Sequence, residues 1–563
     1  MRTLTTLLLL FTAAVCAGQT RQEPLRIDPL TATISGRVST ADTGIPIRRA
    51  EIRAISERGL TRIATSDNDG RYVVRDLPAG TFTVHVSKSG FVPLYFGQRR
   101  PFERRATIEL TQGQRGSADV RLPRAGAIAG RIVDTTGEPV MGASVQALRR
   151  RMVDGQRGLQ SVGIGDITDD TGAYRLYALP PGEYYVTATP RRIEDRFGRP
   201  IVDALPGRGA PIFYPGTANR DEAQRITVDV SGEARADMQL LSVQTSRVTG
   251  AVLSANGAPA AGAMISLLSR DLDFSSTGMG MPTRPLQIQD DAGADGTFAL
   301  EGVPPGSFVL RAQTRPQMPV INPATRQIAG PFTPTMEVAI VPVVVTGDIN
   351  GLTVTTSQGA MVDVVVVADP AASGPPPSNV RVTVRTGDRN ELGMTHNGGG
   401  AKIALSLAAQ SRVLVDGLPD NWAVKAIMLD NQDVTDKPID VRDAQNMTLR
   451  VILTDRTSDV AGRIALPPSN DGSAEATVVV FAEDDRKWAY PSRFVRVART
   501  SDRGAFRISA LPPNEEYRAI AVDYLEDGEE TDPELLSRLR DRATRFSLRE
   551  GERRILDLRV IQR

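Results

Sequence analysis

The sequence predicts an all-β protein built as a string of about five antiparallel β-sandwich domains, with one short helix in the last domain. Three observations lead to this fold class. A strand–turn–strand phrase recurs about every 100 residues, Gly- and Pro-rich turns separate alternating apolar runs, and 563 residues are too many for one ordinary core. A composition of 40% hydrophobic and 24% charged residues is typical of folded globular proteins.

The clearest copy of the phrase is DDTGAYRLYALPPGEYYVTATP, at residues 169–190. The other copies are DNDGRYVVRDLPAGTFTVHV at 67–86, GADGTFALEGVPPGSFVLRA at 293–312, SDRGAFRISALPPNEEYRAIA at 501–521 and a weaker SRVLVDGLPDNWAVKA at 411–426. In the four clear copies, a glycine turn is followed by an aromatic residue, an alternating strand, a Leu or Val, and a proline turn. A repeat of this length indicates tandem domains rather than a short-repeat solenoid.

The proline turn carries its own conformational signal. Two residues after the proline, each copy has Gly or Asn, the residues that best tolerate a left-handed backbone. A type II turn requires a positive φ at this place. We therefore expect a positive φ at the structural turn residues Gly80, Gly182, Gly306, Asn421 and Asn514.

Other segments repeat around the phrase. Copies open with segments such as TISGRVST and AIAGRIVD, and close with strand pairs such as TIELTQGQRGSADVRL. About seven strands in about 100 residues is typical of an antiparallel β-sandwich. The expected domains cover residues 25–124, 125–243, 244–349, 350–455 (the most divergent) and 456–563. Short connections between them favour a semi-rigid string.

These motifs resemble the carboxypeptidase regulatory-like domain, as found in tandem-repeat proteins of bacteria. The resemblance rests on the Gly-x-aromatic and Leu-Pro-Pro-Gly-x-aromatic signature and on the Gly-Arg-Val opening, and it covers most of the chain. It implies a transthyretin-like β-sandwich of the carbohydrate-binding-like group, acting as an accessory or binding module. It does not imply peptidase activity, because its motif residues form turns and core.

One helix is expected inside the last domain, in TDPELLSRLRDRA at 531–543. Asp532 suits the N-cap, Pro533 suits the first helical position, and Glu534 and Arg538 are spaced for an ion pair. The apolar stripe of this helix consists of Leu535, Leu536 and Leu539.

The N-terminus has the pattern of a secretory signal peptide at residues 1–17. Arg2 precedes an apolar stretch at 7–15, and small residues follow up to Ala17. Cleavage near Ala17 would export the protein to the periplasm, the outer surface or the medium. The alternative is lipidation at Cys16, which is the only cysteine. No later stretch predicts a transmembrane span.

The sequence predicts no catalytic residues, no metal and no cofactor. The two histidines, His85 on the exposed face of a strand and His396 in a loop, lack ligand-spaced partners for a zinc site. DNDG at Asp67 resembles the start of a calcium-binding loop. Other copies of the repeat keep this turn although they lack the second Asp, which favours a plain hairpin turn. A net charge of +1 argues against nucleic acid as a partner.

Two aromatic residues are candidates for sugar stacking. Trp488 and Tyr490 are two apart and would share one face of a strand. Alternatively, Trp488 covers a core or an interdomain contact. The sequence thus predicts a non-enzymatic, monomeric, exported binding or spacer protein of the cell envelope, with polysaccharide or another envelope protein as partner. The alternatives are a carbohydrate-binding protein and a carboxypeptidase-associated regulatory protein without its own catalytic site.

Overall fold

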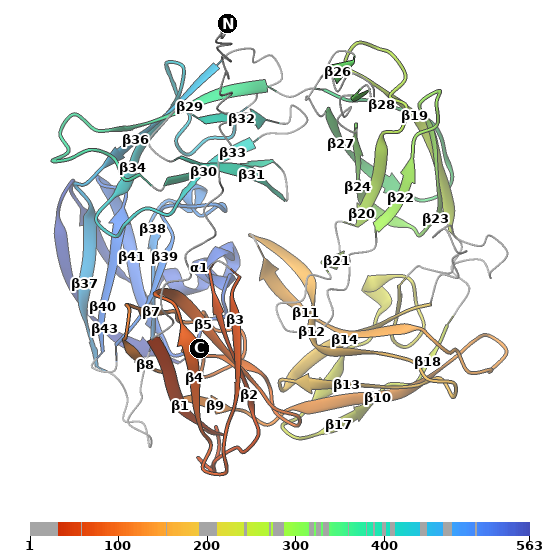
Figure 1. The fold of residues 1–563 in the computed structure, drawn as a ribbon, viewed down its shortest axis with the longest axis horizontal. Coiled ribbons are helices and arrows are strands. Elements are labelled where there is room, and N and C mark those ends of the chain that lie inside the picture. Colours follow the sequence, from red (N-terminus) through yellow and green to blue (C-terminus); the bar gives the residue numbers. More distant parts are fainter. Residues whose placement is uncertain are drawn as a thin grey trace, which may run out of the picture.

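The chain forms five β-rich units, which we number in chain order (Figure 1). The computed structural model describes residues 32–57, 59–153, 155–190, 211–240, 245–269, 272–273, 287–314, 320–321, 328–329, 337–357, 360–378, 380–386, 389–396, 401–405, 411–439, 447–465, 476–501 and 504–562. The expected signal peptide at 1–17 lies outside these residues.

Units 1 and 2 have the same succession of strands. Unit 1 consists of β1 (Ala32–Thr40), β2 (Glu51–Ser56), β3 (Thr61–Thr65), β4 (Arg71–Leu77), β5 (Gly80–Ser87), β6 (Leu94–Tyr95), β7 (Ile108–Leu110), β8 (Arg115–Ser117) and β9 (Val120–Leu122). Unit 2 consists of β10 (Gly126–Val133), β11 (Ser144–Val153), β12 (Gln156–Ile167), β13 (Ala173–Leu179), β14 (Gly182–Thr189), β15 (Ile212–Phe213), η1 (Arg220–Glu222), β16 (Ile226–Val228), β17 (Glu233–Arg235) and β18 (Met238–Gln239).

The remaining units vary this plan, and unit 5 adds the helix. Unit 3 consists of β19 (Ser246–Leu253), β20 (Met264–Ser269), β21 (Leu272–Asp273), β22 (Gln287–Asp291), β23 (Thr297–Val303), β24 (Gly306–Gln313), β25 (Val320–Ile321), β26 (Ile328–Ala329), β27 (Val338–Val345) and β28 (Ile349–Thr355). Unit 4 consists of β29 (Ala360–Ala368), β30 (Val380–Thr386), β31 (Arg389–His396), β32 (Ala401–Leu405), β33 (Ser411–Asp416), β34 (Ala423–Leu429), β35 (Gln432–Asp433) and β36 (Met447–Thr454). Unit 5 consists of β37 (Ser458–Ala465), β38 (Thr477–Ala482), η2 (Asp485–Lys487), β39 (Arg496–Arg499), β40 (Ala505–Leu511), β41 (Glu515–Val522), η3 (Glu529–Thr531), α1 (Pro533–Arg540), β42 (Thr544–Leu548) and β43 (Arg553–Ile561).

Each unit encloses its own apolar core between layers of strands. In unit 1 the sheet β4-β1-β8 lies against the sheet β3-β2-β5-β6, and side chains such as Ile34, Ile52 and Phe82 are buried between them. Units 2 to 5 have corresponding clusters of their own. The predicted fold class, a string of about five β-sandwich domains, is confirmed.

The strands are not all antiparallel. In every unit the opening strand pairs in parallel with a closing strand: β1 with β8 and β9, β10 with β17 and β18, β19 with β28, β29 with β36, and β37 with β43. Parallel first and last strands put the beginning and the end of a unit at opposite ends of its sandwich. The chain can therefore pass into the next unit with hardly any linker, as the sequence suggests.

One predicted boundary needs correction. The range expected for the third domain ends at residue 349, but β28 pairs with β19 from Val248↔Ile349 to Leu253↔Thr355. Val354 on this strand is buried in the core of unit 3. The third unit therefore extends to Thr355; the other limits remain predictions.

A bulge in the four clear copies of the repeated phrase explains their spacing. Tyr174 and Leu176 alternate on β13, and Leu179, at odd spacing, is buried beside them. The register against β10 shifts here, with Gly126↔Leu179 followed by Ile128↔Leu176. The same shift occurs in units 1, 3 and 5. The residue before the buried Leu or Val is left-handed in all five copies, with φ of 59° to 77° at Asp76, Ala178, Gly302, Gly417 and Ala510.

The expected positive φ two residues after the proline occurs at four of the five positions. The φ values are 148° at Gly80, 153° at Gly182, 151° at Gly306 and 62° at Asn514. The three glycine values differ from the φ of about +80° in a type II turn, because each glycine already begins a strand. The prediction is wrong at Asn421, which is not among the described residues with positive φ.

Gly182→Val should destabilise unit 2 by about 1–3 kcal/mol, because a β-branched residue is strained at this φ. A Cβ at this position would meet only Tyr184, at 4.0 Å, so the cost comes from the backbone rather than from crowding. Thermal unfolding and local hydrogen exchange of the full mature chain would measure it. Gly158→Val is the matched control, because the space around Gly158 is open and its φ is not positive. An unchanged unfolding midpoint for Gly182→Val would contradict this account.

The opening Gly-Arg motif has a packing reason. A Cβ on Gly130 would collide with the carbonyl oxygen of Ala236. The hydroxyl of Tyr174 donates a hydrogen bond to the same oxygen over 2.5 Å. Gly130 thus lets the opening strand, the aromatic of the phrase and the closing segment meet at one point.

The predicted helix in the last domain is confirmed as α1. Asp532 is its N-cap and accepts a hydrogen bond from the backbone N–H of Glu534, and Pro533 is its first residue. The apolar stripe Leu535, Leu536 and Leu539 is buried against the sheet of unit 5. Glu534, however, pairs with Arg157 of unit 2 at 2.7 Å, and no ion pair with the expected partner Arg538 is seen.

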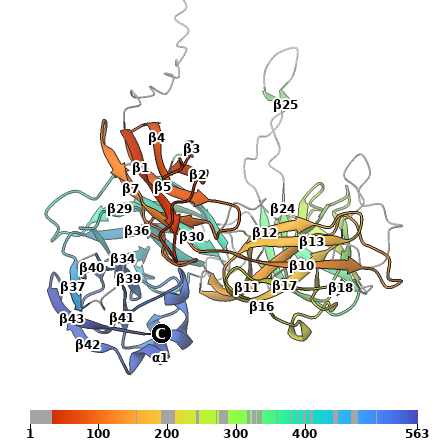
Figure 2. The ribbon, with the colours of Figure 1, turned by 90° about the horizontal axis from the view of Figure 1, so that it is seen from below.

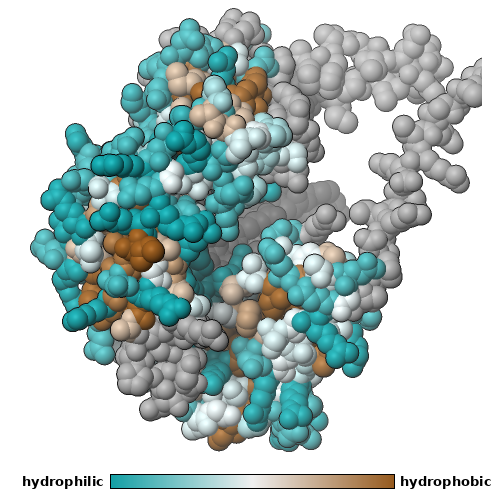
Figure 3. All heavy atoms as spheres, turned by 90° about the vertical axis from the view of Figure 1, so that its left-hand side faces the viewer, coloured by the Kyte–Doolittle hydropathy of each residue, from teal (hydrophilic) through white to brown (hydrophobic). Residues whose placement is uncertain are grey.

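The string closes on itself, because unit 5 contacts units 1 and 2. Both ribbon views place unit 1 beside unit 5 (Figures 1 and 2). Arg149 and Arg151 on β11 form ion pairs with Glu526 of unit 5, at 2.8 and 3.3 Å. The hydroxyl of Tyr524 donates to the carbonyl oxygen of Pro101 in unit 1, over 2.8 Å. The outer face seen in Figure 3 is mostly hydrophilic, with apolar side chains in small patches.

Candidate binding site

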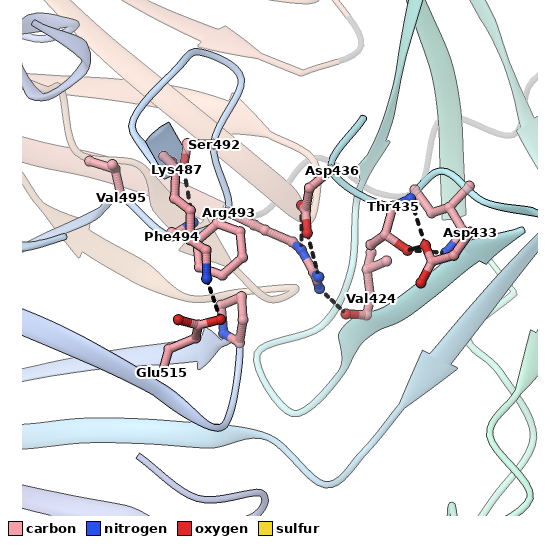
Figure 4. Close-up of polar contacts among 12 residues, drawn as sticks. Val424, Asp433, Thr435, Asp436, Lys487, Ser492, Arg493, Phe494, Val495 and Glu515 are labelled. Atoms are coloured by element: carbon pink, nitrogen blue, oxygen red, sulfur yellow. Dashed lines mark hydrogen bonds and ion pairs between the residues drawn. The ribbon is translucent and has the colours of Figure 1, made fainter. Parts of the chain in front are cut away.

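A cavity of about 490 Å³ lies where unit 4 meets unit 5. Unit 4 contributes β34, Thr454 at the end of β36, and Arg456 just after it. Unit 5 contributes the loop at 486–494 and the proline turn at 511–515. Figure 4 shows the polar contacts at this junction. The turn that recurs in every unit thus forms one wall of the cavity in unit 5.

Arg493 fixes the two units relative to each other. Its guanidinium donates to both carboxylate oxygens of Asp436, at 2.8 and 2.9 Å, and to the carbonyl oxygen of Val424 at 2.8 Å (Figure 4). A bidentate pair restricts orientation as well as distance. The wall that carries Arg493 is therefore held rigidly against β34.

A second cation lies on the same wall. Lys487 pairs with Glu515, which begins β41. Its Nζ also lies 4.9 Å from the centre of the Phe494 ring, and the guanidinium carbon of Arg493 lies 5.4 Å from that ring. Phe494 itself is buried, so it supports the two cations rather than offering a face to a ligand.

The lining of the cavity has an excess of positive charge. Six cationic side chains contribute, against three carboxylates, although the whole chain is nearly neutral. The cations are Arg412, Lys425, Arg456, Arg486, Lys487 and Arg493, and the carboxylates are Asp436, Glu515 and Glu550. A wall of this composition attracts anions.

The predicted sugar-stacking platform is not present. Trp488 is only 2% exposed, and its indole N–H donates to the carbonyl oxygen of Ala482 at 2.7 Å. It caps a short 3₁₀ helix rather than lying on a strand, so Trp488 and Tyr490 do not share an exposed face. Tyr490 packs on Gly155 of unit 2, where a Cβ would collide with it. These aromatics hold core and interunit contacts, as the alternative reading proposed.

The segment containing the two aromatics nevertheless lines the cavity. Lys487, Pro491, Ser492 and Arg493 all come from it. Sequence reasoning singled out this stretch for its rings and missed its cations. The opposite wall belongs to another unit, so no local pattern in the sequence could predict the cavity.

His85 is buried, contrary to the expected exposed position. It is 2% exposed, and its ring lies edge-on to Tyr95, with centroids 4.8 Å apart. β6 pairs with β5 in the same sheet at His85↔Tyr95, so the Tyr95 ring lies beside His85 on the same face. Burial, and secondarily the charge of Arg53, lower the pKa of His85 to about 4.

The stability of unit 1 should therefore fall in mild acid. His85 stays neutral when folded, whereas in the unfolded chain it takes up a proton below its ordinary pKa of about 6.5. Neutral His85 therefore contributes its full stabilisation to the folded state above pH 6.5, and this contribution is lost as the pH falls towards 4. Between pH 7 and pH 5 the free energy of unfolding should fall by about 2 kcal/mol. Urea unfolding at both pH values should show this loss in the wild type and not in His85→Gln. Equal pH dependence in the two proteins would contradict the assignment.

The other sequence-predicted sites have structural explanations. Asp67 accepts hydrogen bonds from the backbone N–H groups of Asp69 and Arg71, at 2.9 and 2.8 Å, as the hairpin reading predicts. His396 ends strand β31 rather than lying in a loop. Within the described ranges, no three His, Cys, Asp or Glu side chains are grouped to hold a metal ion. No helix in the described part of the chain could cross a membrane.

Comparison with known proteins finds a family model that matches the first two units. Residues 33–123 and 127–201 match the model of the carboxypeptidase regulatory-like domain. Units 1 and 2 are therefore similar to the carboxypeptidase regulatory-like domain, and the predicted resemblance is confirmed for these two units. No curated protein sequence matches the chain significantly.

Solved structures of several pilins show similarity in parts. A streptococcal ancillary pilin is 12% identical over 58% of this chain and 99% of its own, with a TM-score of 0.19. The minor pilin GBS52 of Streptococcus agalactiae is 12% identical over 38% and 98%, with a TM-score of 0.20. The shaft pilin spaA of Lactobacillus rhamnosus GG is 11% identical over 38% and 99%, with a TM-score of 0.17. TM-scores this low carry no argument about how the units are arranged.

Proposed function

We propose that the protein is an exported, non-catalytic binding and spacer protein of the cell envelope, in which five β-sandwiches form a closed frame. The observation that carries this proposal is the contact of unit 5 with units 1, 2 and 4. A chain closed in this way keeps its binding surfaces at fixed positions. The chain is proposed to act as a monomer, with envelope polysaccharide or another envelope protein as its partner.

The junction of units 1, 2 and 5 supports a rigid frame. The ring of Phe102 in unit 1 lies near two guanidiniums of unit 2, with its centre 5.1 Å from the carbon of Arg149 and 4.3 Å from that of Arg151. Its carbonyl oxygen accepts a hydrogen bond of 2.8 Å from the backbone N–H of Asp527 in unit 5. Three units thus meet at one residue.

The backbone of Phe102 is in a strained, left-handed conformation at this junction. Its φ is 69°, which costs an L-residue about 1–2 kcal/mol. Such strain persists only where surrounding contacts impose it. The junction is therefore better explained as a specific docking site than as an incidental contact between neighbours.

Export and envelope location are tested by fractionating the source cells. We expect the native protein in the envelope or the medium, with a mature N-terminus close to Gly18 that follows from the signal pattern at 1–17. Sequencing of the native N-terminus measures this. A lipid on Cys16 would change the proposal to an anchored frame, and a cytoplasmic protein that keeps Met1 would overturn it.

A further inference from the structure

We infer that the cavity between units 4 and 5 binds a small molecule with at least two oxyanion groups, either carboxylate or phosphate. This inference names a ligand for the binding function proposed above and rests on it. Some cations in the lining are already paired within the protein, and others are left for a ligand.

Four of the six cations are neutralised within the protein. Arg493 is paired with Asp436, Lys487 with Glu515, and Arg486 with Asp484. Lys425 pairs with Asp369 and lies 3.7 Å from Glu550. These pairs shape the walls and offer little charge to a ligand.

Arg412 and Arg456 differ from these four cations in their surroundings. Arg412 is half-buried on β33, and Arg456 follows β36, so both reach the cavity from unit 4. Neither forms an ion pair with another residue in the described part of the chain. The charge of Arg456 acts on the nearby carboxylates of Asp369 and Asp455, but among the described residues neither guanidinium is held in an ion pair, so each can bind an oxyanion in the cavity.

The guanidinium group selects the chemistry of the ligand. Its planar fork donates two parallel hydrogen bonds to a carboxylate or a phosphate, and it is more weakly hydrated than an ammonium group. A volume of about 490 Å³ is in the range of small-molecule sites. The opposite wall, with Pro491, Pro512 and Pro513, presents apolar surface to the body of such a molecule.

A ligand in this cavity would lie between two units and contact both. The walls of the cavity come from two units that Arg493 locks together. Binding should therefore also stabilise the junction of units 4 and 5, because a ligand that binds only the docked arrangement favours it.

The test is calorimetric titration of the full mature chain at low salt with citrate, pyrophosphate and a hexaglutamate peptide. We expect citrate or pyrophosphate to bind, with an affinity that falls as salt is added. The variant Arg412→Gln/Arg456→Gln should bind about a hundredfold more weakly, because two charge-assisted contacts are lost and each is worth about tenfold in affinity. Whichever of the two anions binds more tightly identifies the source of the oxyanion.

The matched control is Arg48→Gln/Arg71→Gln in unit 1, which removes the same charge from exposed side chains. It should bind as the wild type does. The inference is overturned if neither small anion binds, if both double variants bind equally, or if hexaglutamate binds more tightly than either anion. X-ray scattering of the ligand-free protein tests the closed frame separately, so failure of the ligand and failure of the frame are distinguishable.

Discussion

Arg151→Ala should open the frame. Its guanidinium donates to Glu526 of unit 5 at 3.3 Å and to the carbonyl oxygen of Asp527 at 3.3 Å. The side chains of Arg151 and Glu526 are only 6% and 8% exposed. Removing Arg151 leaves the buried carboxylate of Glu526 paired with Arg149 alone, at 2.8 Å, so the expected cost is below the about 3–5 kcal/mol of a wholly unpaired buried charge. We expect unit 5 to leave unit 2, and small-angle X-ray scattering to report a larger radius of gyration.

Two further variants test whether the effect comes from the buried ion pair of Arg151 and Glu526 or only from the loss of one positive charge. Arg225→Ala removes an exposed partner of Glu183, with side chains 59% and 55% exposed, and should cost less than about 1 kcal/mol without any change in shape. Arg151→Met combined with Glu526→Gln removes both buried charges and should restore most of the docking. Wild-type dimensions for Arg151→Ala would show that the frame does not depend on this ion pair.

Local chemistry made the repeated unit predictable. Asp169 and Gly172 specify the hairpin turn of the phrase, since the carboxylate caps backbone N–H groups and the glycine takes a φ of 76°. Leu535, Leu536 and Leu539 specify the buried side of α1 in the same way. These features depend on residues within a few positions of one another.

The bulge was harder to predict. Alternation from Tyr174 places Leu179 on the wrong face of a regular strand, five positions on. Burying both requires an extra residue in the strand, and the left-handed Ala178 supplies it. Alanine has no preference for a positive φ, so the sequence gives no sign of the bulge at Ala178. The Gly and Asn residues after the proline led to the prediction of a positive φ there instead.

Contacts between units could not be predicted from one chain. Arg151 and Glu526 are separated by 375 residues, and nothing near either one identifies the other. The same reason explains the errors at Trp488 and His85. Both were judged from strand alternation alone. Trp488 is buried among α1 and its neighbours, and His85 packs beside Tyr95 of the adjacent strand β6.

Leu179→Ala should produce a large loss of stability that is confined to unit 2. The side chain is completely buried in the core of this unit, beside Tyr184 and Leu176. Its Cδ2 is so close to Gly163 that a Cβ there would lie 2.5 Å away, so the packing around it is tight. Truncation removes buried methyl groups and leaves a cavity, which costs about 2–5 kcal/mol.

Hydrogen exchange of the full mature chain measures where this loss falls. Protection should drop throughout β10, β13 and β14 and stay unchanged in unit 4, because each unit has a separate core. Val230→Ala is the control in the same unit, since Val230 is 62% exposed and its truncation should cost less than about 0.5 kcal/mol. An equal loss of protection in units 2 and 4 would mean that the closed frame unfolds as one cooperative body. The contacts of Glu526 with β11 and of Arg493 with Asp436 would then couple units 2, 5 and 4 more strongly than their separate cores imply.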